Sequence, residues 1–197
     1  MSRDSTPTED ASILRFDDRK ACVAWLKKNH GKSPGVWLRL AKKNAERASV
    51  SHPEALESAL CYGWIDGQRK SDDVDHGLQR FTPRSARSIW SKINRDKALA
   101  LIASGQMQAA GLNEVERAKS DGRWEAAYDS ARTATIPDDF QLALDANAAA
   151  QAFFALLDAQ NRYAVLFRIQ TAEKVETRVK RIAAFTRMLS EQKKLHP

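Results

Sequence analysis

The clearest structural signal in this chain lies in Tyr62-Gly63-Trp64-Ile65-Asp66-Gly67-Gln68-Arg69-Lys70 and Gln79-Arg80-Phe81-Thr82-Pro83-Arg84. Both stretches alternate residue types with a period of two, and a polar segment, 71–77, separates them. This pattern predicts two antiparallel strands joined by a loop, with the whole hairpin covering residues 62–84. The hairpin brings together a carboxylate, several cations and aromatic rings, which are the residue types that build polar binding sites.

Matching the apolar faces of the two stretches predicts how the strands pair. If the loop centres on Asp73, Ile65 lies opposite Phe81 and Asp66 lies opposite Arg80. In this register the apolar residues are buried and the charged residues are exposed. A slip of one residue would turn every side chain to the other face and bury the charges, so we expect the register without the slip.

On this register the hairpin predicts a ligand site. We expect Arg80 and Arg84 to contact an anionic or polar ligand, Trp64 and Trp90 to form flat apolar walls, and Asp66 to orient Arg80. The alternative is an ordinary cross-strand ion pair on a sheet surface, which contributes only a few tenths of a kcal/mol.

The residues before the hairpin predict a mixture of strands and helices. Ser51 and Glu54 form a capping box, with Ser51 as the N-cap residue and Glu54 three positions later, so a helix should begin there and run to Cys61. We also expect strands over 13–16 and 35–40, and a helix capped by Asp17 or Asp18 that ends near 29–31.

After residue 84 the strand signals end and helical periodicity follows. The expected helices run from Ser88 or Ser91 to residue 104, over 109–120, from Pro137 through Leu144, and over 148–159 and 171–193. Residues 161–170 fit a helix or a strand, and a helix is the favoured of the two. The fold class is therefore α+β, with a small N-terminal sheet and its hairpin packed by helices, followed by an all-helical C-terminal half. We expect a disordered tail over 1–12, an α+β lobe over 13–85 and a helical lobe over 86–197 packed on it.

The composition favours a basic globular protein. The 197 residues carry a formal net charge of +7, which favours anionic partners but does not identify one. The first residues lack the apolar core of a signal peptide, and no apolar run approaches the ~20 residues that span a bilayer. We therefore expect a cytoplasmic protein without a membrane span, in which Cys22 and Cys61 are reduced and buried.

The C-terminal helix is the most basic part of the chain. Residues 174–194 contain seven cations and only two glutamates. Such a face could bind nucleic acid or an anionic membrane surface. It is more often solvated, and no aromatic residues interleave with the cations here. The cations are Lys174, Arg178, Lys180, Arg181, Arg187, Lys193 and Lys194.

No catalytic or metal-binding motif stands out. The four histidines, His30, His52, His76 and His196, lack metal-ligand spacing, and no phosphate-binding glycine loop or nucleophile elbow occurs. We therefore expect neither metal nor cofactor and assign no catalytic residue. An uncharacterised enzyme that uses Asp66 or His76 as an acid or base stays open as an alternative.

Most of the chain after residue 54 resembles a known bacterial family. The matching segments are 59–67, 80–84, 88–91, Asn94, 105–107, Gly111, 118–124 and Glu176-Thr177-Arg178-Val179-Lys180-Arg181-Ile182. In order and spacing they resemble the YdeI/OmpD-associated family, also called bacteriocin-protection proteins. The resemblance implies a soluble cytoplasmic protein linked to toxin tolerance, and it supplies no reaction.

Together these observations predict a cytoplasmic stress or toxin-tolerance protein that binds an anionic small molecule or a protein partner at the hairpin. The alternatives are a nucleic-acid-binding accessory protein that uses the basic C-terminal helix, and the uncharacterised enzyme.

Overall fold

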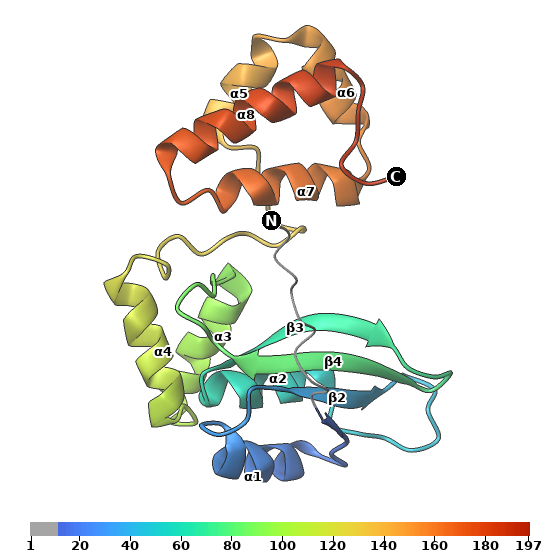
Figure 1. Ribbon diagram of the computed structural model, residues 1–197, viewed down its shortest axis with the longest axis vertical. Coiled ribbons are helices and arrows are strands. Elements are labelled where there is room, and N and C mark those ends of the chain that lie inside the picture. The colour runs from blue at the N-terminus through green and yellow to red at the C-terminus, as the bar shows by residue number, and fades with distance from the viewer. Residues whose placement is uncertain (1–11) are drawn as a thin grey trace, which may run out of the picture. The chain divides into compact units, whose positions relative to one another are not determined.

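The predicted hairpin is present and lies in a four-stranded sheet (Figure 1). In the computed structural model, which describes residues 12–197, strands β3 (Trp64–Ser71) and β4 (His76–Pro83) pair antiparallel. Strand β2 (Val36–Ala41) pairs with the other edge of β4, and the short β1 (Ile13–Leu14) runs parallel to β2. The strand order is β1-β2-β4-β3. The predicted tail lies outside the described residues except for Ser12, whose carbonyl accepts a hydrogen bond from the Trp37 amide.

The predicted register of the hairpin is wrong by one residue. Asp66 lies opposite Phe81, not Arg80, and the register shifts again between Asp66 and Arg69. Burial explains the difference. The observed register places Trp64 on the same face as Phe81, and both side chains are at most 2% exposed. Burying the large indole stabilises the fold more than burying Ile65 on that face would.

A β-bulge at Gly67 and Gln68 absorbs the second shift. The Gln79 amide group donates hydrogen bonds to both bulge carbonyls, at 3.0 Å and 3.2 Å. The Gln79 side chain is buried, with 5% of it exposed. Its amide stabilises the β-bulge because it gives the two bulge carbonyls a hydrogen-bond donor.

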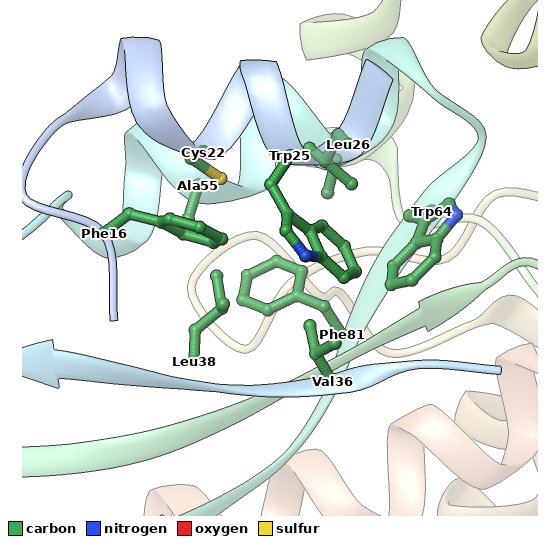
Figure 2. Close-up of a pocket in the computed structure, with 10 residues that line it drawn as sticks. Phe16, Cys22, Trp25, Leu26, Val36, Leu38, Ala55, Trp64 and Phe81 are labelled. Carbon is green, nitrogen blue, oxygen red and sulfur yellow. The ribbon is translucent and has the colours of Figure 1, made fainter. Parts of the chain in front are cut away.

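Helices α1 (Arg19–Asn29) and α2 (His52–Cys61) contribute to the core on one face of the sheet. Asp18 caps α1, and the predicted capping box of Ser51 and Glu54 is present at α2. Figure 2 shows α1 over the strands, with Val36, Leu38 and Phe81 pointing toward it.

The small cavity in this core is not a ligand site. It measures about 10 Å³, and its lining is entirely apolar except for the Cys22 thiol and the indole nitrogens of Trp25 and Trp64. A space of that size without several polar partners stays dry. The residues around it (Figure 2) are Phe16, Cys22, Trp25, Leu26, Val36, Leu38, Ala55, Ala59, Trp64 and Phe81.

Helices α3 (Lys92–Ala103) and α4 (Ala109–Ser120) follow the hairpin. A Cβ added at Gly111 of α4 would lie 2.5 Å from the Cys61 carbonyl oxygen and 2.7 Å from that of Leu60, so α4 approaches α2 closely. Gly63 faces the same helix, because a Cβ there would meet the Ala110 oxygen at 2.9 Å. The described residues divide into two compact units, and 12–88 and 94–124 form the first.

The second unit contains residues 89–93 and 125–197 and is helical. Its helices are α5 (Asp138–Asp145), α6 (Ala148–Leu156), α7 (Ala159–Gln170) and α8 (Val175–Ser190). The helix expected over 148–159 ends at Leu156, because Asp158 accepts a hydrogen bond from the Asn161 amide and caps α7. The predicted α+β fold class is confirmed.

Candidate functional site

Trp64 belongs to the core. It is 1% exposed, its indole Nε1 donates to the His30 carbonyl at 3.0 Å, and its ring packs edge-on against Trp25 with centroids 5.9 Å apart. The indole is therefore a packing element of the first unit, in contrast to the exposed wall expected from the sequence.

Asp66 contacts a histidine from another element. Nε2 of His52, the first residue of α2, lies 3.0 Å from Oδ2 of Asp66, and the His52 ring packs 6.2 Å from the Phe81 ring. The expected pairing of Asp66 with Arg80 is wrong, because the observed register turns these two side chains to opposite faces of the sheet.

Arg80 lies opposite Trp37 on the second face of the sheet. Its guanidinium carbon is 5.8 Å from the centroid of the Trp37 ring, and the Lys70 ammonium lies over the same ring at 4.5 Å. Within residues 12–197 neither cation has an acidic partner, and Nη1 of Arg80 is buried without a hydrogen bond. Three strands thus place two uncompensated cations beside one indole.

Gly35 allows Arg80 to take this position. Its φ of +137° is a conformation that side chains rarely adopt, and a Cβ there would lie 3.0 Å from Arg80 Nη2 and 2.7 Å from the Thr82 methyl group. The backbone at the start of β2 therefore packs directly against the guanidinium.

The remaining predicted site residues, Arg84 and Trp90, are both buried, at 5% and 2% exposed. Arg84 belongs to the first unit, where its amide donates to the Gly63 carbonyl. Trp90 belongs to the second unit, where its carbonyl accepts from the Tyr128 amide. The first unit therefore places Trp64 and Asp66 on one face of the hairpin and Arg80 on the other.

Ion pairs and hydrogen bonds stabilise the acidic loop of the hairpin, residues 72–75. Arg39 forms ion pairs with Asp72 and Asp73, and Asp73 also accepts hydrogen bonds from the Asp75 and His76 amides and contacts the His76 ring at 3.0 Å. Burial raises the Asp73 pKa, but the hydrogen bonds from His76 and Asp75 outweigh it and lower the pKa to about 2. These contacts stabilise the loop, and they give His76 a structural partner.

Sequence reasoning missed three residues of these sites: Trp37, Lys70 and His52. The alternation in 35–40 already placed Trp37 on the face opposite Val36 and Leu38. The sequence pattern did not indicate which strand lies beside β2. Only the folded sheet shows that this neighbour is β4.

Part of the basic C-terminal segment is engaged within the second unit. Nε and Nη2 of Arg178 bind the Asp139 carboxylate at 2.6 Å and 2.8 Å, while Nη1 donates to the Ile169 carbonyl at 2.9 Å. Arg181 donates to the Arg168 carbonyl. Lys193 pairs with Glu191 and Lys194 with Asp158. Among the described residues, the cations of this segment without an acidic or carbonyl partner are Lys174, Lys180 and Arg187.

The model of one family, described as Domain of unknown function (DUF8412), matches residues 14–114, just over half of the chain. The chain belongs to that family. Its matched segment contains β2 to β4, Leu14 of β1, α1 to α3 and the first half of α4, and therefore also the Trp37 face and the His52–Asp66 contact.

A second family model matches the C-terminal part of the chain. Residues 133–192, which contain α5 to α8, match the family described as Bacteriocin-protection, YdeI or OmpD-Associated. This match confirms the resemblance drawn from the sequence for that part of the chain. No curated protein matches the chain. No solved structure matches it either.

Two further features of the described residues bear on function. No helix in residues 12–197 is long and apolar enough to cross a membrane. Over the same range, no group of three or more His, Cys, Asp or Glu side chains is placed to hold a metal ion.

Proposed function

We propose that this protein is a cytoplasmic toxin- or stress-tolerance protein that acts by binding an anionic ligand on the hairpin face around Trp37. The observation that carries the proposal is the placement of Lys70 and Arg80 beside the Trp37 ring, with no carboxylate paired to either cation in the described chain. The link to toxin tolerance rests on the family description of residues 133–192.

The chemistry of this face suits an anion. Cations near an aromatic ring are attracted to its face, which holds them in place without neutralising them. A phosphate or carboxylate would form charge-assisted hydrogen bonds with both groups, which are roughly twice as strong as neutral ones.

The alternatives have less support. Nucleic-acid binding through the C-terminal helix would depend on a segment in which Arg178 and Arg181 are held by groups of the second unit. For the enzyme alternative, Asp66 has a contact that joins β3 to α2, and His76 has a contact within the hairpin loop.

Thermal-shift screening of the full chain against inorganic phosphate, nucleotides, phosphosugars and dicarboxylates tests the proposal. A ligand that binds only the native state raises the free energy of unfolding by RT ln(1 + [L]/Kd), and the melting temperature rises with it. We expect an anionic hit whose Kd rises at least tenfold in Arg80→Gln and in Lys70→Gln.

Arg69→Gln is the matched control. Arg69 is exposed, neighbours Lys70, and projects from the opposite face of the strand, so its loss removes the same charge without touching the Trp37 face. Equal weakening by all three variants would indicate nonspecific attraction to a basic protein and would overturn the site. No hit in the screen, with capture of a protein from cell extract, would support a protein partner instead.

A further inference from the structure

The second unit contains a groove that the hairpin site does not use. It lies between α5, the turn that follows it and α8, and its volume is about 680 Å³. That volume is in the range of small-molecule sites, roughly 300–1,000 Å³. Its lining residues are Asp139, Ala143, Ala146, Asn147, Val179, Ile182, Ala183, Thr186, Arg187 and Ser190.

The floor of the groove is apolar and exposed. Ala143 and Ala183 are too small to fill the space between the helices, and Val179 is 60% exposed. Leu142 and Val175, on the same two helices, are 70% and 74% exposed. An exposed apolar hollow between two helices is typical of a binding region rather than of ordinary solvated surface.

The polar groups of the groove favour a negative charge. Of its two charged residues, Asp139 is held by Arg178, whereas Arg187 is exposed and forms no salt bridge in residues 12–197. The Lys193 hydrogen bond and the more distant charge of Arg187 both lower the pKa of Glu191, so that carboxylate compensates Arg187 only at longer range. Thr186 Oγ1 is buried and has no hydrogen-bond partner among the described residues. Asn147 caps the N-terminus of α6, where the helix dipole also favours an anion.

We propose that this groove binds a single anionic amphiphile, a medium-chain acyl group with a carboxylate head. The acyl chain lies on Ala143, Val179 and Ala183, and the head group contacts Arg187. From Val179 to Arg187 the helix rises about 12 Å at 1.5 Å per residue, which is the length of a medium acyl chain. This site is independent of the hairpin face, which offers two cations but no comparable apolar trough.

Isothermal titration of the full chain with decanoate, below its micelle concentration, tests the site. We expect saturable binding to one site per chain, no binding of acetate, and much weaker binding of the uncharged decyl maltoside. Arg187→Gln should raise the decanoate Kd about tenfold. Lys180→Gln, which removes an exposed charge of the same helix outside the groove, should leave the Kd unchanged.

Two further variants test the apolar part. Ala183→Trp should fill the groove and abolish binding, and Val179→Asp should place a charge against the acyl chain and weaken binding strongly. Both positions are exposed, so each variant should keep the native circular dichroism spectrum and melting temperature, and one folded variant is enough for the test. Arg80→Gln should have no effect on decanoate binding, which separates this site from the hairpin.

Several outcomes would overturn the proposal. Equal affinity for decanoate and decyl maltoside would show that Arg187 does not bind the carboxylate head group. Binding that Ala183→Trp and Val179→Asp both leave intact would place the ligand elsewhere. Sedimentation with anionic phospholipid vesicles in the absence of decanoate binding would show that the surface contacts membranes and does not hold a single amphiphile.

Discussion

His52 and Asp66 are fourteen residues apart, and their side chains meet at 3.0 Å, joining the start of α2 to strand β3. Because a carboxylate only accepts hydrogen bonds, His52 Nε2 carries the shared proton. The side chains are 41% and 25% exposed, so water screens the contact only in part. Asp66 also lies near the N-terminus of α2, where a negative charge is favourable. The contact therefore ties the hairpin to the helix beneath it.

A double-mutant cycle tests this relationship. His52→Ala and Asp66→Ala should each destabilise the first unit and should show a coupling free energy of about 0.5–1 kcal/mol in urea unfolding. The matched cycle of Asp66→Ala with Arg80→Ala should show coupling near zero, because these side chains lie on opposite faces. Strong coupling of Asp66 with Arg80 would restore the register expected from the sequence.

Gly111→Ala should destabilise the first unit by about 1–3 kcal/mol, the usual range for overpacking a tight contact. The added methyl group would enter the space between α4 and the last carbonyls of α2, where Cys61 O is only 2.5 Å away. Gly31→Ala serves as the control, since a Cβ there meets nothing within 4 Å, and it should change stability by less than about 0.5 kcal/mol. Equal midpoints of denaturation for both variants would show that α4 does not pack closely on α2.

Arg178→Gln should destabilise the second unit by about 1–3 kcal/mol, because it removes charge-assisted hydrogen bonds to Asp139 and a bond to the Ile169 carbonyl. Arg178→Lys should rescue little, since a lysine cannot reproduce the planar fork. Lys180→Gln, an exposed cation two residues away, is the control. Unchanged thermal unfolding of Arg178→Gln would leave the ion pair without a structural role.

Asp73 should contribute to acid unfolding. Its pKa in the folded protein is about 2, below the ordinary value of 3.8, so its stabilising effect is fully present above pH 3.8 and is lost as the pH falls to about 2. In Asp73→Asn, the melting temperature should therefore fall less steeply over that interval than in the unmodified chain. His76→Ala should flatten the curve by a smaller amount, because the amide donors remain. A slope that neither variant changes would contradict the depressed pKa.

Cys22 should be unreactive in the folded protein. Burial raises the pKa of its thiol to about 11, so almost no thiolate exists near neutral pH. Burial also raises the pKa of Cys61, and both cysteines are free. Iodoacetamide at pH 8 should label both residues only when denaturant is added, as mass spectrometry would show. Rapid labelling without denaturant would indicate that α1 and α2 open readily.

Local sequence determined the elements of this protein. The capping box of Ser51 and Glu54, and the N-cap at Asp18, one of the two candidates that the sequence offered, depend on interactions within a few residues, and the structure has both. The alternation in 62–84 likewise predicted the hairpin, because side-chain period depends only on the strand itself.

Tertiary structure decided which residues meet. Alternation assigns Trp64 and Ile65 to opposite faces of a strand, but it does not say which face the helices cover. Burial of the Trp64 indole made that choice and moved the register by one residue. The approach of Lys70 and Arg80 to Trp37, and of His52 to Asp66, depends on strand order and helix packing between distant segments. Those contacts are set by the shape of the whole core, because no local interaction brings such distant segments together.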